Sequence, residues 1–309
     1  MPTSMTLIRG VHSRIERITL NEPFAGMFAW PVGNQVGESP VWDASSDTLF
    51  WIDVRGQTVL RLDPAQQVLT RWLMPQVIGA LALVHGQRLL LALVHQLAIF
   101  QLDTCVLSLC APIVSEAAGN RLNEGKLSPS GRWFVFGSMD DRGERKQATG
   151  ALYRADLDGH VTRLHQGLTT ANGIAWAPDC RTLYFSDSYA GRIFQADWDE
   201  QSGSMGEARP FAVSDEASGR PDGALVDAEG SYVSAGVSAG CLNVFGPQGQ
   251  LLGKLSLPVR APTMACFGGH GGSRLFVTSL VRPSWDNADD LDGCLLELDR
   301  RRLSFERPG

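Results

Sequence analysis

Four residues with oxygen-bearing side chains occupy the same position of a repeated sequence frame. The segments "ESPVWDASSDTLFWIDV", "NEGKLSPSGRWFVFG", "NGIAWAPDCRTLYFSDS" and "DGALVDAEGSYVSAG" align with one another, and they begin with Glu38, Asn123, Asn172 and Asp222. Carboxylate and amide oxygens are hard donors that suit Ca²⁺, Mg²⁺ or Mn²⁺. Two carboxylates gathered without a cation would cost repulsion and desolvation. Glu38, Asn172 and Asp222 are therefore predicted to bind one divalent cation, with Asn123 beside them.

The elements that position these residues follow from the same frame. It starts six times, at residues 38, 78, 123, 172, 222 and 263, and the starts are 40 to 50 residues apart. Each copy is typical of a strand, a tight turn and a second strand, and the spacing matches the blade of a β-propeller. We expect an all-β, six-bladed propeller formed by residues 1–309 as a single domain. Because inner strands line the central channel, their first residues should converge at one end of it and form the metal site there. Any one of the polar residues alone would be explained as a turn cap.

The N-terminal segment is expected to close the ring. Residues 13–20, "SRIERITL", can add an outer strand to the last blade, which would remove an exposed sheet edge. Residues 1–10 are expected to be a flexible tail.

Composition excludes several classes of partner. Lys and Arg number 27 against 33 Asp and Glu, for a net charge of −6, and the sequence lacks the basic stripe of a nucleic-acid-binding protein. We also expect neither a membrane span nor a leader segment, because no long apolar run is present and the first residues lack the pattern of a signal peptide. The six cysteines form no CxxC pair, as in a protein of a reducing compartment. We expect a cytoplasmic protein, either a monomer or a homodimer, whose partner is a small molecule.

Rival catalytic motifs are weak. Residues 236–240, "GVSAG", match the nucleophile pattern of serine hydrolases, but that pattern requires a strand that runs into a helix, and this one lies in a strand-turn-strand repeat. His85, His95, His160 and His165 lack metal-ligand spacing and are interpreted as turn or surface residues.

Taken together, the motifs resemble a known family. The segments "GESPVWD", "NRLNEGKLSPSGRWFVFGSM", "ANGIAWAPDCRTLYFSDS", "RPDGALVDAEG" and "APTMACFGG" are similar to those of the sugar lactonases and regucalcin-like proteins, the gluconolactonase or SMP-30 family. The resemblance implies a six-bladed propeller in which Glu38, Asn172 and Asp222 hold one divalent cation. Ca²⁺ is the first choice for that cation, and Mg²⁺, Mn²⁺, Zn²⁺ and Fe²⁺ are alternatives.

The resemblance also implies a set of substrate-binding residues. Arg121 and Asn123 match an Arg and an Asn that line the family's pocket. Glu124 stands where the family usually has Asp, and "GSMDD" offers Asp140 or Asp141, of which Asp141 is preferred, as the acid that contacts sugar hydroxyls. These departures leave the metal ligands in place and leave the preferred sugar open.

The implied reaction is hydrolysis of a sugar lactone to the open-chain aldonic acid by a carboxylic ester hydrolase. Asp222 would act as metal ligand and proton acceptor, and Asn123 and Arg121 would donate hydrogen bonds to the substrate. The alternatives are a noncatalytic, calcium-binding regulatory propeller and a related propeller esterase or organophosphate hydrolase.

Overall fold

The chain forms antiparallel sheets separated by tight turns. The computed structural model describes residues 6–24, 26–85, 87–113, 116–143, 145–156, 158–287 and 289–300. Runs of β-branched, leucine and aromatic residues form the strands, and Gly, Asp, Pro and Ser residues form the turns between them. One short 3₁₀ helix, η1 (His270–Gly272), is the helical element of the described residues.

The strands belong to six sheets, each of which runs from an inner to an outer edge. In that order, the first three sheets contain β5 (Gly37–Asp43), β6 (Thr48–Asp53), β7 (Thr58–Asp63), β8 (Val68–Leu73) and β2 (Ser13–Arg17); β9 (Ala80–Val84), β10 (Arg88–Ala92), β11 (Gln96–Gln101), β12 (Val106–Pro112) and β1 (Thr6–Ile8); and β13 (Asn120–Leu127), β14 (Trp133–Asp140), β15 (Gly150–Asp156) and β16 (Val161–Leu168).

The other three sheets follow the same plan. They contain β17 (Ala171–Trp176), β18 (Thr182–Asp187) and β19 (Arg192–Asp199), with both β20 (Ser204–Met205) and β21 (Arg209–Val213) paired to β19; β22 (Pro221–Val226), β23 (Tyr232–Gly236), β24 (Cys241–Phe245) and β25 (Leu251–Ser256); and β26 (Pro262–Gly268), β27 (Arg274–Ser279), β28 (Leu295–Asp299), β4 (Met27–Trp30) and β3 (Asn21–Phe24).

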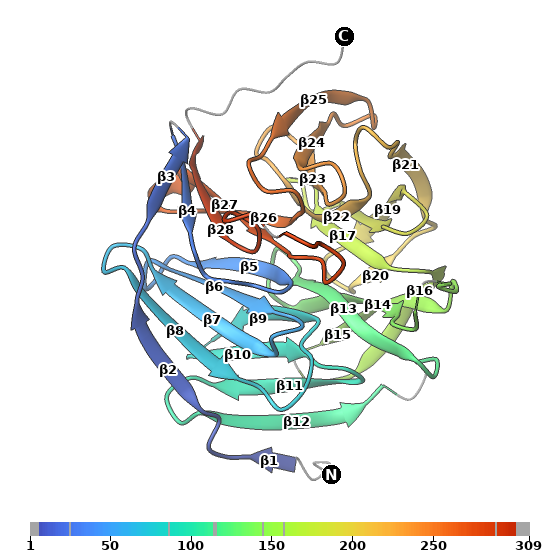
Figure 1. Cartoon of the computed structure of the whole chain (residues 1–309). Coiled ribbons are helices and arrows are strands. Elements are labelled where there is room, and N and C mark those ends of the chain that lie inside the picture. The colour runs from blue at the N-terminus through green and yellow to red at the C-terminus, as the bar shows by residue number, and fades with distance from the viewer. Residues whose placement is uncertain are drawn as a thin grey trace.

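The six sheets are the blades of a propeller. Their inner strands contact one another in the cyclic order β5, β9, β13, β17, β22 and β26, and β26 returns to β5 (Figure 1). Each of the six frame starts lies in an inner strand or within two residues of one, so the predicted six-bladed architecture is confirmed.

The hydrophobic core lies between neighbouring blades. Six clusters of buried apolar side chains separate the six blades, one cluster at each junction. At the junction of the last blade with the first, Trp30 and Phe276 pack with Trp51, and all three side chains are at most 2% exposed. Burying large aromatic rings is a major source of the free energy of folding, and here it holds adjacent blades together.

The N-terminal segment closes the ring with a different strand from the one predicted. Residues 13–20 do not join the last blade: β2 pairs with β8 at the outer edge of the first blade. The last blade is completed instead by β4, which pairs with β28, and by β3 beyond it (Figure 1). Trp30 fixes this closure, because its indole N–H donates to the Glu297 carboxylate over 2.9 Å.

The expected N-terminal tail also differs from the structure. Within residues 1–10, Thr6–Ile8 form β1, which pairs with β12 at the outer edge of the second blade, and residues 1–5 lie outside the described residues. The first two blades therefore gain a fifth strand each, because β1 and β2 cover outer edges that would otherwise be exposed.

Candidate metal and active site

The inner strands are irregular where the predicted site residues stand. Each of the four inner strands whose frame begins with Glu, Asn or Asp has a bulge there, and so does β26 at Thr263, whereas β9, whose frame start is apolar, pairs with β10 in regular register. A bulge bends a strand and re-aims the side chains beside it. The four register shifts lie between Glu38 and Val41, Leu122 and Gly125, Asn172 and Ala175, and Pro221 and Ala224.

The bulge in β17 depends on the glycine that follows Asn172. Gly173 has φ +65°, which disfavours residues with a Cβ, and an added Cβ would lie 2.3 Å from the Tyr232 hydroxyl oxygen. The Tyr232 hydroxyl donates to the Gly173 carbonyl over 2.8 Å. The "NG" dipeptide thus places Asn172 at the channel, while the bare glycine backbone lets the neighbouring blade approach.

Asn172 joins the third, fourth and fifth blades at one end of the channel. Its Nδ2 donates to Asp222 Oδ1 over 2.7 Å and to Ser188 Oγ over 2.7 Å. Its Oδ1 accepts a hydrogen bond of 2.6 Å from Asn123 Nδ2, which also donates to the Ala171 carbonyl. Three of the four frame-position residues are therefore hydrogen-bonded to one another.

Arg121 extends this chain of contacts to the first blade. Its Nη1 donates to Asn123 Oδ1 over 2.8 Å, and its Nε lies 3.3 Å from Asp141 Oδ1. The Asp141 carboxylate also accepts a hydrogen bond from Arg55, whose Nη2 lies 2.6 Å from Asp141 Oδ1. Asp140, the alternative acid, is instead fully buried and paired with Arg142, so Asp141 is the one placed beside Arg121.

The carboxylates of Glu38 and Asp222 are both buried and lie close enough to interact. Burial, followed by repulsion from Asp222 and Glu124, raises the pKa of Glu38 well above its usual range. Burial and repulsion from Glu124 raise the pKa of Asp222 to about 8. Two carboxyl groups with raised pKa values at one position need a positive charge beside them to ionise together at neutral pH.

The donor set fits a divalent cation. Glu38 and Asp222 supply carboxylate oxygens and Asn172 supplies an amide oxygen, and all three residues are at most 9% exposed. Oxygen-only ligands of this kind suit hard cations, and a charge of +2 matches two carboxylates. The backbone N–H of Ser39 also donates to Glu38 Oε2 and fixes that side chain.

Glu124 is oriented differently from its neighbour Asn123. Its two carboxylate oxygens accept the backbone N–H groups of Gly173 and Ile174, over 2.6 and 2.8 Å, and its side chain is buried. Burial raises its pKa to about 7, opposed by the nearby ammonium of Lys126. Glu124 therefore contacts the backbone of β17, and its predicted contact with substrate stays a prediction.

Comparison with known proteins identifies the family of this chain. A family model described as SMP-30/Gluconolactonase/LRE-like region matches residues 36–281, from the first inner strand through β27 of the last blade. The chain belongs to the SMP-30/gluconolactonase family.

Relatives in this family carry two kinds of name. The chain is 32% identical over 248 residues to an L-arabinolactonase from Azospirillum brasilense, covering 80% of this chain and 81% of that protein. It is 30% identical to a regucalcin from Xenopus laevis over 251 residues, covering 79% and 83%. A solved structure of a calcium-binding regucalcin from Agrobacterium tumefaciens has a TM-score of 0.81 and 28% identity, with 90% and 96% of the two chains covered.

Two residues near the candidate site, Arg55 and Ser188, were not predicted from the sequence. Arg55 lies in the turn between β6 and β7 and reaches Asp141 of the third blade, so no local pattern could reveal the pair. Ser188 follows β18 within the frame "TLYFSDS", and its position just after a strand end at the channel was the available signal.

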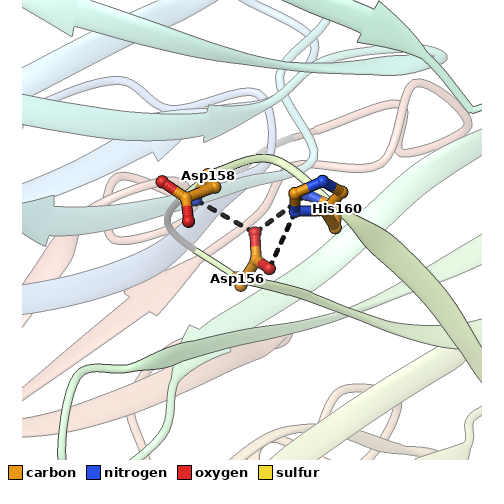
Figure 2. Close-up of side chains that lie close together, drawn as sticks. All are labelled: Asp156, Asp158 and His160. Atoms are coloured by element: carbon orange, nitrogen blue, oxygen red, sulfur yellow. Dashed lines mark hydrogen bonds and ion pairs between the residues drawn. The ribbon is translucent and has the colours of Figure 1, made fainter.

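A second acidic cluster of this family member lies away from the channel, on the hairpin between β15 and β16. The Asp156 carboxylate accepts the backbone N–H groups of Asp158 and His160, and it lies 3.0 Å from His160 Nδ1 (Figure 2). These are the contacts of an aspartate that caps a turn, and the His160 side chain is 82% exposed. The interpretation of His160 as a turn residue is confirmed, whereas the same interpretation of His165 is wrong, because His165 lies within β16 and its ring packs against Phe185 and Phe194.

Two further sequence expectations can be compared with the fold of this family member. All six cysteines are free. Within the described ranges, no helix has the length and apolar character needed to cross a membrane.

The raised pKa values of these carboxyl groups predict how the thermal stability of the metal-free protein changes with pH. Glu124 and Asp222 have folded-state pKa values of about 7 and about 8, above their unfolded values, so their contribution to stability is present at low pH and lost as pH rises through 7 to 8. We expect the Tm of metal-free protein to fall by about 3 °C or more between pH 6.5 and 8.5. Differential scanning calorimetry with a chelator present would measure this.

The matched control for this pH effect is Asp222→Asn, which removes one of the titrating groups. It should show a smaller fall in Tm over the same pH range, and Ca²⁺ should raise the wild-type Tm at pH 8.5 because it binds the folded state. An equal fall in both proteins would contradict the assignment of the effect to Asp222.

Proposed function

We propose that this protein hydrolyses a sugar lactone to the open-chain aldonic acid, with a divalent cation held by Glu38, Asn172 and Asp222. The observation that carries the proposal is the buried chain of hydrogen bonds from Arg121 to Asn123 and from Asn123 to the proposed ligand Asn172, which in turn donates to Asp222. A protein that only stores or senses a cation needs no such donors next to it. The lactonase names among its relatives support the same class of reaction.

The bound cation would polarise the lactone carbonyl and so make it a better electrophile. Asp222 has the additional role of proton acceptor for the attacking water, because its carboxylate lies at the channel end with one oxygen held by Asn172. That hydrogen bond leaves the other carboxylate oxygen in a fixed direction. Asp222 would later return the proton to the leaving ring oxygen.

Arg121 and Asn123 are proposed to position the substrate and to stabilise charge that develops on its oxygen. Both side chains are buried and hydrogen-bonded to each other, so little reorganisation is needed during reaction. Asp141 would hold the Arg121 guanidinium in place and accept a hydrogen bond from a sugar hydroxyl, since its side chain is 26% exposed. Glu124 would act by holding the bulge of β17, and therefore Asn172, in position.

The proposal is tested by acid release from lactones. Metal-loaded protein should hydrolyse gluconolactones and pentonolactones well above the spontaneous rate, and EDTA should remove the acceleration until Ca²⁺, Mg²⁺, Mn²⁺, Zn²⁺ or Fe²⁺ is restored singly. Titration of released acid in a pH-stat measures both rates. Tight calcium binding without acceleration for any lactone would instead support a noncatalytic calcium-binding propeller, and turnover of simple esters or organophosphates alone would indicate the related esterases.

A further inference from the structure

A groove lies at the rim of the channel between the fifth and sixth blades. It has a volume of about 700 Å³, and its lining includes Arg220, Ser238, Arg260, Arg282 and Trp285. These residues come from the loops that precede β22 and β26 and that follow β23 and β27. Such loops lie on the face where the inner strands begin, which is also the face of the candidate metal site.

Two of the three arginines in the groove have no carboxylate partner among the described residues. Arg260 is paired with Asp292 through a contact of 2.7 Å, and its guanidinium lies 3.8 Å from the centroid of the Trp285 ring. By contrast, neither Arg220 nor Arg282 forms an ion pair with any residue in the described part of the chain. Their charges are therefore available to a ligand.

Both free arginines lie on the face of the propeller that carries the proposed reaction centre. Arg220 comes two residues before Asp222, and its guanidinium lies 5.8 Å from the centroid of the half-exposed Tyr189 ring. Arg282 lies in the loop that follows β27 and lines the same groove as Arg220.

The lining of the groove contains three arginines and no carboxylate, although the whole chain carries −6. A divalent cation would match the carboxylates of Glu38 and Asp222, and on the opposite side of the mouth Arg55 and Arg121 share the single carboxylate of Asp141. In the groove itself, Arg220 and Arg282 are the two guanidinium groups without a carboxylate partner among the described residues. A local positive field in an acidic protein attracts anions, and planar guanidinium groups bind carboxylates and phosphates in two-point contacts.

We propose that the substrate is a lactone with a second anionic group, a carboxylate or a phosphate, at the end remote from the lactone carbonyl, and that Arg220 and Arg282 bind this group. The inference rests on the proposed lactonase function and specifies its substrate class. The exposed Tyr189 ring, beside Arg220, would pack against the sugar carbons between the two ends.

The first test compares matched lactones that differ only at the remote carbon. D-Glucono-1,4-lactone is compared with D-glucaro-1,4-lactone for the carboxylate, and D-glucono-1,5-lactone with its 6-phosphate for the phosphate. We expect kcat/KM to be about tenfold or more higher for at least one anionic partner, chiefly through a lower KM, and the advantage to shrink as NaCl increases. The partner that shows the advantage identifies the anion.

The second test removes each free arginine. Arg282→Gln and Arg220→Gln should each lower the ratio of kcat/KM for the anionic lactone to that for its neutral partner by about 10-fold or more, the size of a lost charge-assisted hydrogen bond. The control is Arg132→Gln, an exposed arginine in the turn between β13 and β14 at the opposite end of the channel, which should leave the ratio unchanged.

Two failures are distinguishable. If neutral and anionic lactones are hydrolysed equally well and neither arginine variant changes the ratio, the anionic substrate is wrong and the lactonase proposal stands. If no lactone of either kind is hydrolysed faster than spontaneously, the lactonase proposal fails and this inference fails with it.

Discussion

Asp222→Asn is expected to abolish lactone hydrolysis, with kcat reduced by about 10³-fold or more even when divalent cation is present in saturating excess. Asparagine has nearly the same shape as aspartate, and its amide oxygen can still accept the 2.7 Å hydrogen bond from Asn172. An amide cannot accept the proton of the attacking water at neutral pH. Stopped assays at several lactone and metal concentrations would separate lost chemistry from lost binding.

The matched variant for this test is Glu38→Gln. Glu38 is proposed only as a ligand, so Glu38→Gln should weaken metal binding in a calorimetric titration, and excess metal should restore most of the turnover. Asp222→Asn should show the metal defect without the recovery. Wild-type turnover by metal-saturated Asp222→Asn would show that no protein base is needed, and unchanged metal affinity in both variants would show that the ligands are misassigned.

Asn123→Ala is expected to lower kcat by about 10²-fold to 10³-fold, the usual effect of removing one hydrogen-bond donor at a developing oxyanion. The Asn123 side chain accepts a hydrogen bond from Arg121 and donates one to Asn172. Its removal therefore also releases these two side chains from the positions in which they would meet the substrate. Metal affinity should change by less than about tenfold, because Asn123 is not a proposed ligand. Steady-state kinetics with metal-saturated enzyme measure the effect.

The control for Asn123→Ala is Asn243→Ala in β24. Asn243 is also buried, and its Nδ2 also donates to a backbone carbonyl, that of Ser218, which lies outside the set of proposed site residues. Asn243→Ala should lower stability without the loss of kcat. If Asn123→Ala raises KM and leaves kcat intact, its role is binding of the ground-state substrate.

The predicted architecture depended on local strand and turn patterns that the tertiary structure retains. The alternation of β-branched and aromatic residues with tight turns identified strand pairs, and the spacing of the frame identified six of them. The placement of Asn172 beside Asp222 and Asn123 followed, because equivalent positions of inner strands must converge on the channel. Repetition therefore allowed a long-range arrangement to be read from a linear pattern.

Ring closure shows where this reasoning fails. Residues 13–17 and 27–30 both form short strands, and either could satisfy the hydrogen bonds of an open sheet edge. Which edge each strand meets depends on the path of the chain between blades. In the structure Trp30 enters the junction between the last and first blades and so selects β28 as the partner of its strand.

The directions of the neighbouring side chains of Asn123 and Glu124 also depend on contacts between blades. Asn123 and Glu124 lie side by side in the sequence, but the bulge in β13 directs Asn123 toward the channel residues and Glu124 toward the backbone of β17. A pattern of residue types contains no information about this change of direction, because it depends on which unpaired N–H groups the next blade presents.

The sequence by itself determined the six-bladed ring, the inner strands and the residue types that gather at one end of the channel, because these follow from local strand and turn preferences repeated at a regular spacing. Only the tertiary structure decided which strand closes the ring, that Arg55 reaches Asp141, and that Arg220 and Arg282 stand without carboxylate partners among the described residues. Ion pairs and free charges depend on distances between segments far apart in the chain, and folding alone sets those distances.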